Sequence, residues 1–441
     1  MKRDYWKRTL VLLPLLLTVW LCPAWATDVT VGCPGGIGGQ FSSINDALNA
    51  LDQFGPHSIT VSGTCTENLF IHDRNGITII AAAGQKATVT NAANPPAIVI
   101  QFFRGRRMVL AGLTVQGGST GVLVNEDSDV ILQNCTVQGS LGDGFDVQQG
   151  ASAGIESSIF QKNAGSGVSA SSNSTLTLAT SPQQRIQIRN NGYAGINADG
   201  SYLQINFGTV TSENNGGPGM VATGGRLEIF GDNPTTALGN LFQGNHDGID
   251  IFNGASALFY GHNVVRNNGA VGLQVDGSTA DFLGGSLPDR TPDGFDIEGQ
   301  SLLGVNVTGS SEVTFMGAHA VRNNGSTGGD PDFLSGLRVS RSSVTIAGGV
   351  HIVNNVGPGV LADFKSGLEI DPNVSVRGNG AGGIQLLHQS AGDITGRSST
   401  FIQPISCDDT SLLFGDLRGI QTNCKNEEQS SQGASHPGIK R

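Results

Sequence analysis

Apolar and polar positions alternate along most of the chain around one motif: a glycine, an apolar residue, a variable residue and a second apolar residue, written here Gly-φ-x-φ. Successive copies are 23 to 32 residues apart. A repeat of this length is typical of solenoid proteins, in which each unit packs against its neighbours. The copies begin at Gly121, Gly144, Gly167, Gly195, Gly219, Gly248, Gly272, Gly304, Gly336, Gly359 and Gly383.

Two more alternating stretches complete each unit. STLTL at 174–178 and SSVTI at 342–346 are examples of the second stretch, and RNNG strings at 189, 266 and 322 end the third. Period-two alternation between Gly, Asn and Ser turns predicts short strands, since Asn and Gly accept left-handed turn conformations. Three strands in about 23 residues leave no room for a crossover helix. The pattern therefore predicts an all-β fold, a parallel β-helix of about 13 coils.

The alternation also predicts which side chains face outward. If the two φ residues of each motif point into the core, the x residues form a row along the outside of the rod. This row consists of Leu123, Asp146, Ser169, Asn197, Val221, Asp250, Gln274, Asn306, Arg338, Leu361 and Gln385.

Both ends of the solenoid carry cap-like segments. Ile44, Leu48 and Leu51 are spaced as on a helix behind Ser43, with Asp46 three residues further on, which predicts a short N-terminal capping helix. The predicted organisation is a signal peptide at 1–26, an N-terminal cap with the first coils at 27–97, and repeats at 98–400. A C-terminal cap at 401–424 and a flexible polar tail at 425–441 follow.

The first residues predict export. A basic start, MKRDYWKR, precedes an apolar run and the small residues Ala24 and Ala26, which is the pattern of a secretory signal peptide. We expect a protein that is extracellular or periplasmic, has no membrane span and is a monomer. Its formal charge of −11, which becomes more negative without residues 1–26, disfavours nucleic acid as a partner.

Export permits disulfide bonds. We expect Cys33 to pair with Cys65 and Cys407 with Cys424, because each pair would close one end of the chain. Cys135 lies inside an apolar pattern, LQNCTVQG, and is expected to be a buried core residue rather than a reactive thiol.

The opening of the mature chain resembles a known family. Residues 37–80, which include IGGQFSSINDALNAL and ENLFIHDRNGITIIAAAG, are similar to the first coils of right-handed parallel β-helix proteins of the pectate-lyase-like superfamily. That superfamily includes polygalacturonases, pectin methylesterases and alginate epimerases. The resemblance implies a right-handed helix and, where a substrate exists, an acidic polysaccharide.

One candidate site is the string GNHDGID at 244–250. It is similar to the Asn-Thr-Asp-Gly element of polygalacturonases, which makes Asp247 and Asp250 candidates for catalysis. Asp beside Gly is also ordinary turn chemistry, and that is the expected role of Asp247. Glycoside hydrolysis needs two nearby carboxylates, and the outward row offers Asp250 no carboxylate one or two coils away. The other polygalacturonase motifs are absent between Gly248 and the C-terminal cap.

A second candidate site comes from the two longest repeat intervals. Their extra residues lie at 288–301 and 326–335, and we expect two loops side by side on one edge of the rod. The predicted calcium ligands are Asp293, Asp296, Asp330 and Asp332, because clustered carboxylates suit Ca²⁺. By the pectate lyase resemblance, Arg338 would act in a calcium-assisted β-elimination, with Asp296 as a further catalytic candidate. The alternative is a set of solvated acidic loops near a lone arginine.

Two functions therefore remain open. The first is a secreted protein that binds or processes an extracellular, acidic polysaccharide. The second is a non-catalytic extracellular rod, an adhesin or a spacer. Uneven loops favour the first function, and the lack of a complete catalytic signature favours the second.

Overall fold

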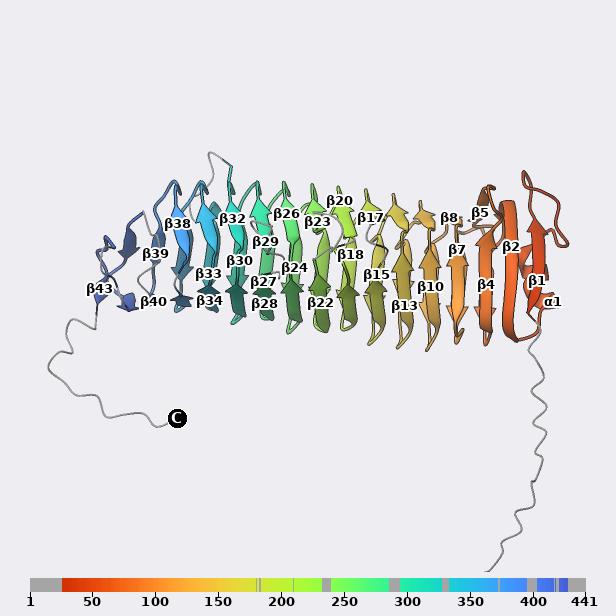
Figure 1. Ribbon diagram of the computed structural model, residues 1–441, viewed down its shortest axis with the longest axis horizontal. Helices are drawn as coiled ribbons and strands as arrows, with labels where there is room; N and C mark the ends of the chain where they lie inside the picture. Colours follow the sequence, from red (N-terminus) through yellow and green to blue (C-terminus); the bar gives the residue numbers. More distant parts are fainter. Residues whose placement is uncertain are drawn as a thin grey trace, which may run out of the picture.

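The chain forms a straight rod of stacked coils, from the helix α1 at one end to strand β43 at the other (Figure 1). The structure is a computed structural model and describes residues 26–179, 181, 184–208, 210–231, 239–284, 294–326, 333–371, 373–394, 403–415, 417 and 420–426. Every strand pairing among these residues is parallel, and each strand pairs with its equivalents in the coils before and after it. The predicted parallel β-helix is confirmed.

Each full coil contributes one strand to each of three sheets, which we name A, B and C. Sheet A contains β1 (Thr27–Gly32), β2 (Phe54–Thr66), β4 (Asn75–Ala81), β7 (Met108–Ala111), β10 (Asp129–Gln133), β13 (Ser152–Glu156), β16 (Thr175–Leu178), β19 (Tyr202–Ile205), β22 (Arg226–Phe230), β25 (Ser256–Tyr260), β28 (Thr279–Leu283), β31 (Glu312–Met316), β34 (Ser343–Ala347), β37 (Gly367–Ile370), β40 (Ala391–Ile394), β42 (Leu412–Gly415) and β43 (Lys425–Asn426).

Sheet B begins with the end of β2, which bends from sheet A into sheet B. It continues with β5 (Ala87–Thr90), β8 (Thr114–Gln116), β11 (Thr136–Gln138), β14 (Ile159–Gln161), β17 (Ile186–Arg189), β20 (Val210–Glu213), β23 (Asn240–Gln243), β26 (Asn263–Arg266), β29 (Phe295–Glu298), β32 (Ala320–Arg322), β35 (His351–Val353) and β38 (Ser375–Arg377).

Sheet C has 14 strands among the described residues. They are β3 (Leu69–His72), β6 (Ile100–Phe103), β9 (Val122–Asn125), β12 (Phe145–Val147), β15 (Val168–Ser171), β18 (Ile196–Asp199), β21 (Met220–Thr223), β24 (Ile249–Phe252), β27 (Leu273–Asp276), β30 (Val305–Thr308), β33 (Leu337–Ser340), β36 (Val360–Asp363), β39 (Ile384–Leu386) and β41 (Ile405–Cys407).

The Gly-φ-x-φ motif is the strand of sheet C together with the residue before it. In β24, Ile249 and Ile251 are fully buried in the core on either side of Asp250. The glycine is required by close packing of coils: a Cβ on Gly248 would lie 2.2 Å from the carbonyl oxygen of Gly272 and 2.3 Å from Val265 Cγ1. Only glycine lets the chain enter sheet C this close to the next coil.

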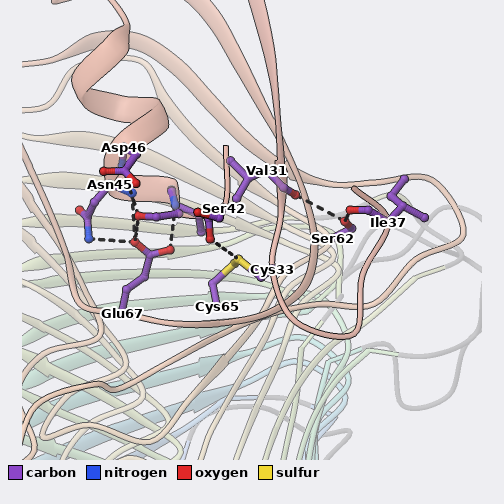
Figure 2. The surroundings of a disulfide bond; sticks show 11 residues. Val31, Cys33, Ile37, Ser42, Asn45, Asp46, Ser62, Cys65 and Glu67 are labelled. Atoms are coloured by element: carbon purple, nitrogen blue, oxygen red, sulfur yellow. Dashed lines mark hydrogen bonds between the residues drawn. A yellow bond between two sulfur atoms is a disulfide. The ribbon is translucent and has the colours of Figure 1, made fainter. Parts of the chain in front are cut away.

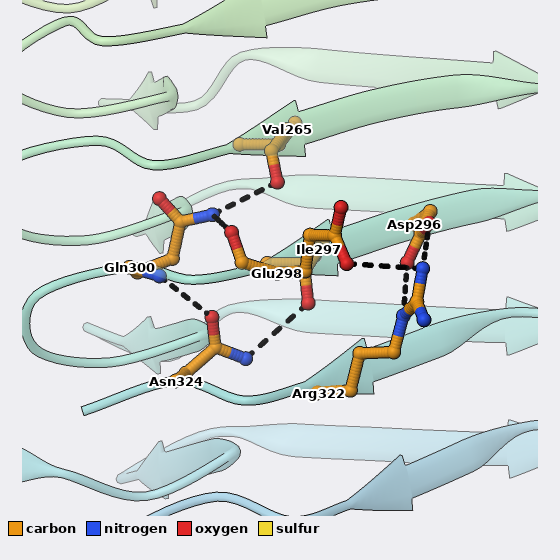
Figure 3. Close-up of polar contacts among 7 residues, drawn as sticks. All are labelled: Val265, Asp296, Ile297, Glu298, Gln300, Arg322 and Asn324. Carbon is orange, nitrogen blue, oxygen red and sulfur yellow. Dashed lines mark hydrogen bonds and ion pairs between the residues drawn. The ribbon is translucent and has the colours of Figure 1, made fainter.

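A column of buried amide side chains runs inside the turn from sheet B to sheet C, and we name it the amide ladder. In a typical step, Asn245 Oδ1 accepts hydrogen bonds from the backbone N–H of Asn215, at 3.0 Å, and from Asn215 Nδ2, at 2.9 Å. Figure 3 shows the step at Gln300, whose N–H donates to Asn324 Oδ1 at 3.1 Å. The ladder consists of Asn163, Asn191, Asn215, Asn245, Asn268, Gln300, Asn324, Asn355, Asn379 and Gln403.

The two asparagines of each RNNG string have different structural roles. The first asparagine, as in Asn190 and Asn267, has a positive φ, 56° and 54°, which turns the chain out of sheet B. The second, Asn191 or Asn268, belongs to the amide ladder. The predicted left-handed turns are confirmed.

The N-terminal capping helix is confirmed as α1 (Ile44–Ala50), with Ser43 as its N-cap. The Ser43 hydroxyl accepts a hydrogen bond from Asp46 N–H at 3.3 Å. Glu67, from the first full coil, adds a carboxylate that accepts from the N–H groups of Ile44, at 2.8 Å, and Asn45, at 3.0 Å (Figure 2). A carboxylate is favourable there because the first N–H groups of a helix have no partner within it.

All three cysteine predictions are confirmed. Cys33 is bonded to Cys65 beside α1 (Figure 2), and Cys407 to Cys424 near the other end. Cys135 is buried in the core, and burial raises the pKa of its thiol to about 11. Among the described residues, no helix is long and apolar enough to span a membrane.

Replacing Asn245 by Ala should show how much the amide ladder stabilises the fold. The substitution removes the acceptor for two buried N–H donors of Asn215, so we expect the free energy of unfolding to fall by about 3 kcal/mol in urea denaturation. The control is Gln187→Ala, which removes an amide from the partly exposed outer face of β17. It should change stability by no more than about 0.5 kcal/mol. Equal effects of the two substitutions would contradict a special role for the ladder.

Candidate functional site

The predicted outward row is present on the outer face of sheet C. Strand registers place each x residue beside its equivalent in the next coil, for example Val221 beside Asp250 and Asp250 beside Gln274. The full order from Leu123 to Gln385 is as predicted. Adjacent side chains are therefore separated by the strand spacing of about 4.8 Å.

Polar atoms on this face are buried without hydrogen-bond partners among the described residues. Asp146 and Asp250 are only 8% and 7% exposed. The unpaired atoms include one carboxylate oxygen each of Asp146, Asp250 and Asp363, the amide oxygen of Asn306 and Nε of Arg338. Buried polar atoms in folded proteins normally have partners, because leaving one unpaired costs about 1 to 3 kcal/mol. Their concentration on sheet C marks it as the candidate binding face.

Asp250 has the most perturbed carboxyl group of this row. Burial, followed by the nearby negative charge of Asp247, raises its pKa to about 7, against a smaller opposite effect of His246. Asp247 lies in the turn before the strand, where its Oδ1 accepts the N–H of Val271 in the next coil at 2.9 Å. Its Oδ2 lies 2.7 Å from Nδ1 of His246. Asp247 is thus the expected turn residue, and its charge adds to the effect of burial in raising the pKa of Asp250.

Asp146 repeats this arrangement four coils earlier. Asp143 Oδ1 accepts the N–H of Ser166 at 2.6 Å, as Asp247 accepts that of Val271. Burial and the charge of Asp143 raise the pKa of Asp146 to about 6, while a hydrogen bond from Gln148 lowers it. Asp146 was predicted from sequence as a member of the outward row but not as a candidate site residue. The sequence signal that could have identified it is the string Asp-Gly-apolar-Asp, which occurs at 143–146 and at 247–250. In both strings the first aspartate lies in the same coil as the buried aspartate whose pKa it raises, rather than in the neighbouring coil of the row.

The expectation that Asp296 lies on a loop beside Arg338 is wrong. Asp296 lies in β29 of sheet B, whereas Arg338 lies in β33 of sheet C. The two inserts belong to different connections between sheets. The first begins between β28 of sheet A and β29 of sheet B and continues through β29, whereas the second lies between β32 of sheet B and β33 of sheet C. Arg322 binds Asp296 through Nε at 3.1 Å and Nη2 at 2.7 Å, and also contacts Glu298 at 3.0 Å (Figure 3).

Arg338 does lie in the outward row, three coils from Asp250 and thus roughly 14 Å away. Its Nη2 is 3.3 Å from Asp363 Oδ2 in the next coil, and its guanidinium lies over the ring of Phe333 at 5.2 Å. Its side chain is 18% exposed. The residue is held in place from two sides and faces the same surface as Asp250.

The predicted calcium ligands are not brought together in the described part of the chain. Asp293, Asp330 and Asp332 lie outside the described residues, and the carboxylate of Asp296 is occupied by Arg322. In the described ranges, one group has metal-like spacing, Cys33, Cys65 and Glu67. Its cysteines form a disulfide and Glu67 caps α1, so these three residues do not fit a metal ion.

The raised pKa of Asp250 predicts a pH-dependent stability. The pKa is about 7 in the folded protein against an ordinary value of 3.8, so the folded state holds the proton more tightly. This contribution is complete below pH 3.8 and is lost as the pH rises through about 7. Relative to Asp250→Asn, the wild-type free energy of unfolding should therefore fall across this window, by a few kcal/mol in order of magnitude.

Urea denaturation at a series of pH values measures this difference. The control is Asp281→Asn on the exposed outer face of β28, which should keep the wild-type pH profile. Parallel profiles for wild type and Asp250→Asn would show that Asp250 titrates normally.

No curated protein matches the chain. Among solved structures, pectate lyase Pel9A is 13% identical, with 67% of this chain and 79% of that chain covered and a TM-score of 0.40. The periplasmic alginate epimerase AlgG is 11% identical, with coverage of 85% and 83% and a TM-score of 0.43. The A-module of the Azotobacter vinelandii mannuronan C-5 epimerase AlgE6 is 13% identical, with coverage of 86% and 97% and a TM-score of 0.37.

Likenesses at this level say nothing about the activity of this chain. The family described as "Right handed beta helix region" matches residues 42–181 and 120–287, which together make up more than half of the sequence. With three parallel sheets formed by successive coils, the chain belongs to the right-handed β-helix family.

Proposed function

We propose that the protein binds or processes an extracellular polysaccharide along the outer face of sheet C. The observation that carries this proposal is the row of buried, unpaired polar atoms on that face, from Asp146 through Asp250 and Asn306 to Arg338. The row repeats at the strand spacing of about 4.8 Å, which suits a long chain with a repeated unit. Sugar hydroxyls both donate and accept, so they can pair with carboxyl, amide and guanidinium groups alike.

Asp250 is the group in this row most suited to chemistry. With a pKa of about 7, it keeps its proton in weakly acidic solution, and a protonated carboxyl can donate a hydrogen bond or act as a general acid. The charge of Asp247, whose two oxygens contact Val271 N–H and His246 Nδ1, adds to burial in raising this pKa. A hydrolase would need a second carboxylate across the bond. The described neighbours of Asp250 in the row, Val221 and Gln274, do not provide one.

An oxidising compartment, extracellular or periplasmic, accompanies this proposal. Two disulfides close the two ends of the described chain. Disulfides of this kind persist outside the cytosol, where polysaccharides of cell walls and matrices are found.

Substitutions in the row test the proposal directly. Asp250→Asn and Asn306→Ala should each weaken binding to the preferred polysaccharide about tenfold. Asn306→Ala removes a buried amide, and Asp250→Asn replaces a carboxyl oxygen that can accept a hydrogen bond by an NH2 group that can only donate. The matched control is Thr314→Ala, which lies on the outer face of sheet A and should bind as wild type does. Affinity electrophoresis or calorimetry against a panel of neutral and acidic polysaccharides measures the affinity. A wild-type protein that binds none of them would favour the non-catalytic rod.

Calcium-assisted β-elimination stays a separate prediction, since three of its expected ligands lie outside the described residues and the fourth, Asp296, does not fit. If it occurs, uronans should give an unsaturated product that absorbs in the ultraviolet. Product formation should stop with EDTA and with Arg338→Ala, while Arg377→Ala on the exposed face of sheet B should leave it unchanged. Turnover that survives Arg338→Ala would remove Arg338 from the mechanism.

A further inference from the structure

A cavity of about 490 Å³ lies at the turns that lead from sheet C to sheet A near the C-terminal end. It is lined by Arg341, Phe364, Lys365, His388, Gln389 and Thr410. These residues follow β33, β36, β39 and β41, which are consecutive strands of sheet C. The cavity therefore lies at the edge of the face that carries the outward row, three residues beyond Arg338.

The lining is cationic in a protein that is strongly acidic. Arg341 and Lys365 are basic side chains, and the described residues that line this cavity include no carboxylate. Within the described ranges, neither side chain is in an ion pair. The nearby Asp408 is turned to the backbone, where its oxygens accept the N–H groups of His388, at 2.6 Å, and Thr410, at 3.0 Å. Glu312 lines a neighbouring cavity that shares Arg341 and Lys365.

The same cavity contains two stacked aromatic rings. The rings of Phe364 and His388 stack with centroids 4.7 Å apart and an interplanar angle of 9°, and Arg341 of the preceding coil lies over Phe364 at 5.7 Å. Phe364 is 43% exposed, so the edge of its ring remains accessible. The exposed edge of such a stack offers apolar surface to the C–H groups of a sugar.

Large side chains replace glycine at these turn positions compared with the middle of the rod. Arg341, Phe364, Lys365 and His388 all have positive φ values, between 52° and 64°. Coils in the middle of the rod have glycine at the equivalent of Arg341 and Phe364, as at Gly224 and Gly277, whose backbone N–H groups bond to the next coil. A non-glycine residue is slightly strained at a positive φ. Three successive coils nevertheless have cationic or aromatic side chains at this turn, where glycine would be unstrained.

We propose that this cavity is an anionic-sugar subsite, which holds a sugar ring with a carboxylate or sulfate group at one end of the sheet C face. Arg341 and Lys365 bind the anionic group, and the Phe364–His388 stack receives the ring. This inference deepens the proposed polysaccharide function and rests on it. The cavity would supply the positive charge needed to bind an acidic polysaccharide. The outward row contains one cation, Arg338, and that residue is already paired with Asp363.

Calorimetry with three short probes tests the subsite: trigalacturonate, its neutral methyl ester and a sulfated galactose trimer. Wild type should bind at least one anionic trimer about tenfold more tightly than the ester, and added salt should reduce the difference. The double substitution Arg341→Gln/Lys365→Gln should abolish this preference. Phe364→Ala should weaken all three probes similarly, since it removes the ring surface and no charge.

The matched control is Lys162→Gln/Arg377→Gln, which removes the same charge from exposed positions elsewhere on the rod and should keep the wild-type preference. A preference for either anionic probe that depends on Arg341 and Lys365 supports the subsite and identifies its anionic group. Equal affinity for anionic and neutral probes in wild type, or a preference that survives the double substitution, would overturn it.

Failure of the proposed function gives a different result. Long polysaccharides would then bind wild type and Asp250→Asn equally, or not at all, whatever the cavity variants do. If instead Asp250→Asn weakens polymer binding and the cavity double substitution leaves the anionic preference intact, only the subsite is wrong.

Discussion

The amide ladder is the interaction on which the remaining structure depends. From Asn163 to Asn379 each of its amides is buried and bonded to the coils on both sides, so no coil can shift in register without leaving several polar groups unpaired. A repeat solenoid is otherwise held by contacts between neighbouring coils alone. The ladder repeats the same hydrogen bonds at the start of the turn from sheet B to sheet C from Asn163 to Gln403, although the intervals between coils vary in length.

The turn held by the ladder supports sheet C, whose outer face contains buried polar groups without hydrogen-bond partners. The backbone of each sheet C strand is fixed by the ladder before it and by buried residues such as Ile249 and Ile251 within it. Side chains on the outer face can then be buried without partners, as Asp250 and Asn306 are, at a stability cost that the core offsets. The same burial raises the pKa values of Asp146 and Asp250, so the chemistry of the face is a consequence of its packing.

The turns between the sheets differ in side chains and in length. The turn from sheet C to sheet A is glycine-rich in the middle of the rod and carries Arg341, Phe364, Lys365 and His388 near the end. The turn from sheet B to sheet C keeps its ladder amide at Asn324 even where the second insert lengthens the connection between β32 and β33. The fold thus repeats one buried amide from coil to coil and varies the rest of its turns, which is how one scaffold can serve many functions.

The sequence alone determined four features of the fold. The three-sheet coil and the outward row follow from the periodic alternation, and the capping helix follows from helical spacing behind its N-cap. Both disulfides follow from the positions of the cysteines near the chain ends. The relation between the two aspartates of each Asp-Gly-apolar-Asp string was not visible, since burial and electrostatic coupling exist only in the folded coil. The third such string, at 293–296, has the same letters as the other two. Only the tertiary structure places its strand, β29, in sheet B rather than sheet C. The sheet that a strand joins depends on its order within the coil, and the first insert makes that order unclear in the sequence. For the same reason, the cationic cavity could not be predicted: its residues lie 21 to 24 positions apart from one coil to the next and meet only when the coils stack.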